Sequence, residues 1–434
     1  MNNEAKALLN KPSISLLLKG WAYQYLGILC LSSFLFADFY FVSSLGFKAL
    51  VAISILSPFV LLLITLFLRI GTANTVVVAQ DAAAAKSKHP GTAIFLMVLI
   101  TAGLSALWLP FQSEIRLWLG AALPTWQLVE DYLKVAFWGF LGLAALTATL
   151  SHLRGLGQHN IIFKTMAVLA LTNLLLDPLF IFGLGPIAAK GIAGAAVASN
   201  IAIWTAFFYV MIQGQKSLLP GKPDLVTLKK ILFLGTPLAL MSALVPLRDF
   251  LAIQNGGTLG PEALSALGVG QRIDLGIQLF FFALVSVITP QITFSNSKGL
   301  KEDLRNTLSF SIKFSLLYVL LMVITLTAFS NKIVELLTED IAVQSYAQYF
   351  LHVVPWSYLL FSLMYIGNAW LTALGETKKV ALIGAMTMLV QITSLQFLSA
   401  TFEFHGIVWS YLITSISSVC LVAYFLKPAF DKLR

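Results

Sequence analysis

The sequence predicts an all-α integral membrane protein with twelve transmembrane helices in two six-helix bundles, related by a pseudo-two-fold axis along the membrane normal. Three observations predict this fold: the composition, the number of apolar stretches, and a repeat near half of the chain length. Of 434 residues, 58% are hydrophobic and only 11% are charged, against roughly 25% charged in an average soluble domain. So few charges cannot cover a water-exposed surface, which excludes a soluble enzyme and a nucleic-acid-binding protein.

The number of long apolar stretches predicts the number of transmembrane helices. A helix that crosses the hydrocarbon layer needs about 20 mostly apolar residues, because lipid offers the backbone no hydrogen-bond partner. Twelve stretches meet this requirement, at 15–44, 48–79, 92–111, 131–151, 160–183, 191–213, 229–255, 262–291, 306–330, 345–373, 378–400 and 406–427. The first is too long for a signal-peptide core, so we expect it to be retained as a helix.

The distribution of Lys and Arg predicts the orientation in the membrane. Of the 28 residues, twenty lie in or beside the termini and the even-numbered connections, five lie in or beside odd-numbered connections, and three lie deep within spans. Positively charged connections stay in the cytoplasm, so we expect a protein of the inner (cell) membrane with both termini cytoplasmic. This placement accounts for the net charge of +9 without a nucleic-acid partner.

Short patterns recur at about half of the chain length. The recurring pairs are Leu45-Gly46 with Leu259-Gly260, Leu156-Gly157 with Leu374-Gly375, and Gly191-Ile192 with Gly406-Ile407, at offsets of 214, 218 and 215. Each pair occupies the same place in a six-span topology. Two halves of six spans have the same membrane orientation, as in secondary transporters built from parallel repeats.

The repeat predicts the domain organisation. We expect an N-terminal six-helix bundle at 1–213, a cytoplasmic linker at 214–228 and a C-terminal six-helix bundle at 229–434. A duplicated membrane scaffold without transport is the alternative interpretation.

Charged side chains inside the spans indicate function, because each costs roughly 2.5–3.5 kcal/mol at the centre of a membrane helix. Asp38 lies in the first span, and Asn173 and Asp177 lie in the fifth. Residues four apart point from one face of a helix. An amide oxygen and two carboxylates form an oxygen-rich site that suits Na+ or a shared proton, because nearby buried carboxylates do not both stay ionised without a cation. The hydroxyl of Ser199 is a candidate further ligand.

Each of these residues also has a structural interpretation. Asp177 can cap or pair locally before Pro178, and Asp38 can be an interfacial carboxylate near the outer end of its helix. The small residues that precede Ser199 are as typical of close helix packing as of ligand binding. The sequence leaves these alternatives open.

The second half does not repeat the constellation. Adding 217 to the positions of Asn173 and Asp177 gives Val390 and Ser394, and no carboxylate. The intramembrane charges of this half, which are secondary site candidates, are Arg248, Asp249, Arg272 and Asp274. We interpret these as structural pairs more readily than as coupling sites, so the asymmetry favours one ion site in the N-terminal half.

These motifs resemble those of the multidrug and toxic compound extrusion (MATE) transporters. The matching segments are Leu153-Arg154-Gly155-Leu156-Gly157, Asn173-Leu-Leu-Leu-Asp177-Pro178-Leu-Phe-Ile-Phe-Gly183, Gly191-Ile-Ala-Gly194-Ala-Ala-Val-Ala-Ser199, and Asp38 ahead of Leu45-Gly46. The resemblance covers the whole chain, in motifs in the first half and mainly in topology in the second. The pattern is most similar to the DinF-type and archaeal branch, although the proline often found in the first helix is absent from Lys19-Gly20-Trp21-Ala22-Tyr23.

The resemblance implies an antiporter, not an enzyme. It would export amphipathic or cationic organic compounds (multidrug or xenobiotic efflux) in exchange for Na+ or H+, by alternating access of the two bundles. The implied cation site is Asp38, Asn173, Asp177 and Ser199, the first three being metal ligands if Na+ is the coupling ion, and no other cofactor is implied. We expect a monomer in the lipid bilayer.

Two other functions are considered. A lipid-linked oligosaccharide or polyprenyl flippase of the same superfamily often has fourteen spans and a strongly cationic cavity. Here there are twelve spans, and the only arginines within them are Arg69, Arg248 and Arg272. A membrane-embedded enzyme needs clusters of histidines and carboxylates, which five scattered histidines do not supply.

Overall fold

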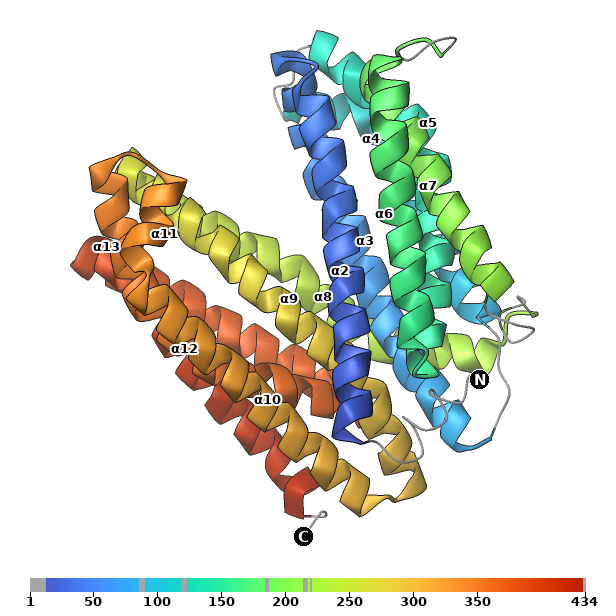
Figure 1. Ribbon diagram of the computed structural model, residues 1–434, viewed down its shortest axis with the longest axis vertical. Helices are drawn as coiled ribbons and strands as arrows, with labels where there is room; N and C mark the ends of the chain where they lie inside the picture. The colour runs from blue at the N-terminus through green and yellow to red at the C-terminus, as the bar shows by residue number, and fades with distance from the viewer. Residues whose placement is uncertain are drawn as a thin grey trace. The chain divides into compact units, whose positions relative to one another are not determined.

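The computed structural model describes residues 13–85, 90–118, 123–183, 187–213, 218 and 221–431, without the side chains at 58, 107–110, 115, 118, 123, 243–253, 255, 256, 258, 337 and 429–431. The described chain is almost entirely helical (Figure 1). Its helices are α2 (Ile14–Ser43), α3 (Phe47–Ala83), α4 (Gly91–Trp118), α5 (Leu123–Gly155), α6 (His159–Phe182), α7 (Gly191–Gln213), α8 (Leu225–Thr258), α9 (Pro261–Lys298), α10 (Lys301–Ala328), α11 (Ser330–Leu337), α12 (Ile341–Ala373) and α13 (Thr377–Asp431).

Twelve apolar segments of the described chain match the twelve predicted spans. Ten helices are long and apolar enough to cross a membrane. The segment Gly91–Ala106 of α4 is a shorter apolar helix, and α13 consists of two helical segments that meet at Glu403, whose φ is 52°. The predicted all-α membrane fold is therefore confirmed.

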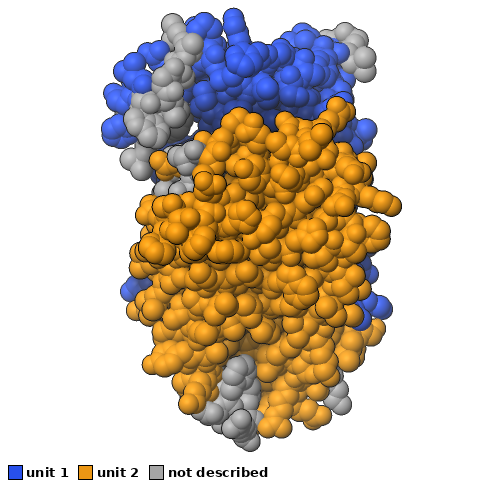
Figure 2. Space-filling view, turned by 90° about the vertical axis from the view of Figure 1, so that its left-hand side faces the viewer, with its two compact units in different colours: residues 1–7, 18–235 blue, residues 8–17, 236–434 orange. Residues whose placement is uncertain are grey.

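The chain forms two compact units, coloured separately in Figure 2. Unit 1 consists of residues 1–7 and 18–235, and unit 2 of residues 8–17 and 236–434. Helix α8 begins at Leu225, inside the predicted linker, and contributes residues to both units. Residues 214–217, 219 and 220 of that linker lie outside the described ranges, and the predicted boundaries stay a prediction.

Two hydrogen bonds fix the direction of α2 and α6 within unit 1. Gln24 bonds to His159 at 2.8 Å, and Asp38 accepts a hydrogen bond from Asn173 at 3.0 Å. Both pairs are 135 residues apart, so the two helices run parallel and in one register over fourteen residues. Parallel packing is what the alternating topology requires of the first and fifth spans.

The sequence repeat is visible in the backbone. Residues 153–158, which join α5 to α6, and residues 371–376, which join α12 to α13, form the same turn. Gly157 and Gly375 have φ of 70° and 82°, a region in which glycine avoids the clash of a Cβ atom. In each turn the next residue donates its N–H to the carbonyl oxygen five positions back, at 2.9 and 2.8 Å. A second repeated pair, Gly46 and Gly260, also has a positive φ at both positions. Two of the three sequence repeats therefore have the same backbone conformation in both halves.

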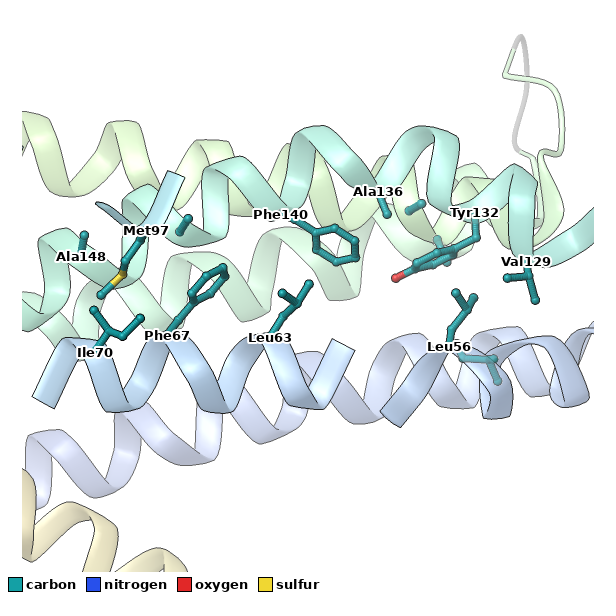
Figure 3. Close-up of a cluster of buried hydrophobic side chains, with 14 of the residues drawn as sticks. Leu56, Leu63, Phe67, Ile70, Met97, Val129, Tyr132, Ala136, Phe140 and Ala148 are labelled. Carbon is teal, nitrogen blue, oxygen red and sulfur yellow. The ribbon is translucent and has the colours of Figure 1, made fainter. Parts of the chain in front are cut away.

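The core of unit 1 lies largely between α3, α4 and α5 (Figure 3). Phe67 of α3 and Met97 of α4 are fully buried, and Phe140 of α5 is nearly so. Towards the other end of the cluster, the ring of Tyr132 lies near Leu56. This apolar cluster holds α5, against which α7 packs.

Helices α6 and α7 approach each other closely because one residue has no side chain. A Cβ atom on Gly194 would lie 2.2 Å from the backbone oxygen of Phe180, far inside van der Waals contact. Small residues allow this kind of close approach between membrane helices. The crossing also determines where Ser199, further along α7, meets α6.

We predict that Gly194→Ala separates α6 from α7 and destabilises the protein. A collision with backbone cannot be relieved by a rotamer change, so the free energy of unfolding should fall by about 1–3 kcal/mol or more. Thermal unfolding of the detergent-purified protein measures the change. Gly103→Ala is the control, because nothing lies within 4 Å of a Cβ atom there, and equal melting temperatures for the two variants would contradict the packing account.

Candidate cation-binding site

Helix α6 carries its polar residues on its buried face. Asn173 and Asp177 are both 0% exposed, whereas Leu171 and Leu175 are 61% and 71% exposed. This is the reverse of a helix on a water-soluble protein and is typical of a span whose apolar face meets lipid. The spacing of four residues places both polar side chains on one face, as the sequence predicts.

The structure brings the four predicted site residues together within unit 1. The amide nitrogen of Asn173 donates to Oδ1 of Asp38 and to Oδ1 of Asp177, both at 3.0 Å. The hydroxyl of Ser199 donates to Oδ2 of Asp38 at 2.8 Å. Asn173 therefore stands between the two carboxyl groups, and Ser199 holds the one from α2. We call these four residues the oxygen cluster.

Two oxygen atoms of the oxygen cluster have no hydrogen-bond partner among the described residues. They are Oδ1 of Asn173 and Oδ2 of Asp177, and both are buried. The two amide protons of Asn173 and the hydroxyl proton of Ser199 are already donated to other oxygens. An unsatisfied buried acceptor is costly, and oxygen atoms are the ligands that hard cations prefer. The donor set therefore fits a bound cation or an added proton.

The electrostatic repulsion between the two carboxyl groups also favours a bound cation or proton in the oxygen cluster. The carboxyl groups of Asp38 and Asp177 interact directly with each other as well as through the amide nitrogen between them. Two like charges about 4 Å apart repel by about 4 kcal/mol at an effective dielectric constant of 20. Burial adds a desolvation cost for each charge. A single positive charge within the cluster removes much of this penalty, so the geometry favours a cluster that is seldom empty.

Tyr132 of α5 is a neighbour of the oxygen cluster that the sequence did not reveal. It is buried and interacts electrostatically with both Asp38 and Asp177. A tyrosine carries no charge that stands out from an apolar span. Its position is visible only once α5 is packed against α6 and α7.

The positions of Asp38, Asp177 and Ser199 bear on their structural interpretations. Asp177 lies inside α6, five residues before its end, and bonds to Asn173 one turn earlier. Asp38 is half-buried and receives hydrogen bonds from α6 and α7. Close packing is the role of Gly194, which leaves the hydroxyl of Ser199 available to Asp38. A cation-binding role for these residues stays a prediction.

The secondary candidates belong to helices of the second half, within unit 2. Arg248 and Asp249 belong to α8, and their side chains lie outside the described residues. Arg272 is exposed on α9, and no ion pair joins it to Asp274 in the described part of the chain. Asp274 instead accepts a hydrogen bond from Gln278 at 2.6 Å, one turn along α9. The Asp274 carboxyl group also interacts with Tyr358 of α12.

The fold is that of a multi-pass membrane protein with a buried cluster of polar oxygen atoms in its first unit. A profile of the MatE family matches residues 25–179 and 237–395, which is most of the chain. The chain belongs to the MATE family of transporters, and is a transporter rather than an enzyme. Its predicted place in the DinF-type and archaeal branch stays a prediction.

Individual relatives agree with this assignment. The chain is 26% identical over 362 residues to the FAD transporter of Shewanella oneidensis, covering 81% of this chain and 80% of that protein. It is 26% identical over 349 residues to the multidrug export protein MepA of Staphylococcus aureus, covering 78% and 74%. Among solved structures, the Vibrio cholerae MATE transporter VcmN in the bent form has a TM-score of 0.89 at 21% identity, covering 100% and 99%. A MOP superfamily transporter from Pyrococcus furiosus has a TM-score of 0.84 at 18% identity, covering 98% of each chain.

We predict that Ser199→Ala destabilises the protein, because Oδ2 of Asp38 loses its donor at 2.8 Å. A hydrogen bond to a charged group contributes about 1.5–3 kcal/mol, measurable by thermal unfolding in detergent. Ser199→Thr keeps the hydroxyl and should change the melting temperature much less.

Ser33→Ala is the control for this prediction. The Ser33 hydroxyl is exposed on α2 and bonds only to the carbonyl oxygen of Leu29 in the same helix, at 2.9 Å. If Ser33→Ala lowers the melting temperature as much as Ser199→Ala, the bond to Asp38 has no special weight.

Proposed function

We propose that this transporter exports amphipathic or cationic organic compounds, in exchange for Na+ or H+ bound at the oxygen cluster, by alternating access of its two halves. The observation that carries the proposal is the pair of buried acceptors without partners, Oδ1 of Asn173 and Oδ2 of Asp177, beside a second carboxyl group. Membership of a transporter family supports the transport step, and the chemistry of the cluster supports the coupling step.

The coupling follows from the cost of leaving the cluster empty. When a cation or proton is bound, the charge of one carboxylate is balanced and the remaining acceptors are satisfied. When it leaves, the carboxylates of Asp38 and Asp177 repel each other across Asn173. The occupied and empty clusters therefore favour different arrangements of α2 against α6 and α7. An ion gradient can bias such a two-state element.

If Na+ is the coupling ion, the cluster residues supply its ligands. Asp38, Asn173 and Asp177 each offer a side-chain oxygen, and Ser199 offers a hydroxyl oxygen. If a proton is the coupling ion, the same carboxylates share it, and the Asn173 amide keeps its two hydrogen bonds. The cluster chemistry is thus suited to either ion, and transport in defined gradients distinguishes them.

FAD is a second candidate substrate. A relative that is 26% identical and covers 81% of this chain is named an FAD transporter. The S. aureus relative, equally identical over 78%, is named a multidrug export protein. Membership of the MATE family favours both over the flippase alternative. We favour organic cations because export of a cation for an inward cation matches the acidic cluster.

The proposed setting is the inner membrane, with both termini in the cytoplasm. It is supported by the twenty Lys and Arg residues in or beside the termini and even-numbered connections. The proposed active species is a monomer, since the oxygen cluster is assembled within one unit of one chain.

We predict that Asp38→Asn and Asp177→Asn each reduce ion-coupled efflux to the level of protein-free liposomes. Each variant keeps the shape of the side chain but removes the charge that binds the ion. The assay follows efflux of a fluorescent organic cation from proteoliposomes, first under an imposed Na+ gradient and then under a pH gradient.

Asp131→Asn is the control for this assay. Asp131 is exposed on α5, where it pairs with Lys134 at 3.4 Å, so its variant should transport like the wild type. Elution of each purified variant as a single peak from a size-exclusion column shows that it is folded. Full coupled efflux by either cluster variant would remove the oxygen cluster from the mechanism.

We also predict that proteoliposomes move the fluorescent cation but not FAD at equal concentration. The two phosphates of FAD are negatively charged, so the carboxylates of the oxygen cluster repel them, whereas the same carboxylates attract an organic cation. Parallel measurement of both compounds in one preparation tests this. Gradient-driven movement of FAD alone would establish the second candidate in place of the first.

A further inference from the structure

A second buried polar cluster lies at the opposite end of α6 from the oxygen cluster. It consists of Gln24 of α2, Arg154 near the end of α5, and His159 at the start of α6. Gln24 and His159 are 2% and 3% exposed. His159 precedes Asp177 by eighteen residues, or about 27 Å of helix. Proposed ion exchange at the oxygen cluster gives this second group no role.

The hydrogen bond within the cluster fixes the proton on His159. The amide nitrogen of Gln24 lies 2.8 Å from Nδ1 of His159. An amide nitrogen can only donate, so Nδ1 accepts and Nε2 carries the ring proton. Nε2 is buried and has no hydrogen-bond partner among the described residues. His159 thus presents a neutral ring with one unused donor.

Arg154 adds a second unused donor and a positive charge. Its Nε is buried and also lacks a partner within the described ranges. No ion pair joins Arg154 to a carboxylate within the described residues. Arg154 is close enough to His159 to interact with it electrostatically. The cluster therefore combines buried donors with a net charge of one.

The start of α6 contributes donors of its own. The first backbone N–H groups of a helix have no acceptor within the helix. Gln158 occupies the N-cap position, and its side chain makes no capping hydrogen bond. The positive end of the helix dipole lies at the same place, an arrangement that binds phosphates and other anions.

The internal repeat shows that Arg154 is not needed to build the turn. At an offset of 218, Arg154 corresponds to Thr372 and His159 to Thr377. The turn at 371–376 has the same hydrogen bonds and the same left-handed glycine as the turn at 153–158. The turn itself therefore does not require the guanidinium and imidazole groups, which occur at this place only in the first half.

We propose that Arg154, the Nε2–H of His159 and the N-terminus of α6 bind a singly charged phosphate group, of a phospholipid or of a dissolved phosphodiester. A monoanion balances the one charge of Arg154 beside a neutral imidazole. Helix α5 ends at Gly155 and α6 begins at His159, so the cluster lies at the ends of two spans, the depth of lipid headgroups. The site binds an anion, whereas the oxygen cluster binds a cation.

The test is direct binding to the purified full-length protein, measured by native mass spectrometry. The probes are phosphatidylglycerol, its deacylated headgroup glycerophosphoglycerol, and diacylglycerol, which has the acyl chains without the phosphate. In the wild type, phosphatidylglycerol should bind more tightly than diacylglycerol. Arg154→Gln should weaken that binding by about tenfold or more, the loss expected for one charge-assisted contact. Arg154-dependent binding of glycerophosphoglycerol would identify dissolved phosphodiesters as a source, and its absence would identify the lipid.

Two further variants keep the test decisive. Lys164→Gln removes an exposed cation from α6 and should change the affinity by less than about twofold. Arg154→Thr introduces the residue found in the corresponding turn and serves if Arg154→Gln does not fold. Equal binding of phosphatidylglycerol and diacylglycerol by the wild type overturns the proposal, as does an affinity that is the same with and without Arg154.

Discussion

The amide group of Asn173 is the contact on which the oxygen cluster depends. One nitrogen atom donates to carboxyl groups on α2 and α6 at 3.0 Å each, and both Asn173 and Asp177 are 0% exposed. Because both amide protons are used in this way, the amide oxygen and Oδ2 of Asp177 remain as buried acceptors. A cation or a proton satisfies them, so the same contact that joins two helices also creates the need for a bound charge.

The packing of the helices serves this contact. Parallel register between α2 and α6 brings Asp38 level with Asn173, and the glycine at position 194 lets α7 approach until Ser199 reaches Asp38. A change in the charge of the cluster therefore acts on three helices at once. We propose that in this chain of the MATE family such a switch links ion binding to the movement of a transported compound. The buried donors at the other end of α6 extend the same principle to an anion.

The sequence indicates which polar residues of the first half lie together, because charges stand out in apolar spans and because a spacing of four residues fixes a helix face. Their cation-binding role stays a prediction. The sequence also predicts the repeat from its recurring Leu-Gly pairs. In the structure Gly157 and Gly375 of one such pair both have a positive φ. Tyr132 was missed because an uncharged ring in a span gives no signal. Gln24 and His159 were missed because residues 135 apart meet only through tertiary packing. Helix α5 begins at Leu123, eight residues before the predicted span at 131. The charged residues Glu130 and Asp131 interrupt the apolar pattern there but do not interrupt the helix.

Infrared difference spectroscopy of the purified protein tests the central claim most directly, since a protonated carboxyl group absorbs at a frequency distinct from that of a carboxylate. If the oxygen cluster always holds one positive charge, that charge is a proton when the buffer contains no Na+. The wild-type protein then has a protonated carboxyl band that is absent from both Asp38→Asn and Asp177→Asn. If Na+ competes for the cluster, adding it to the wild type removes the band. A spectrum without any such band in Na+-free buffer would show that both carboxylates stay ionised with nothing bound, and would contradict the account.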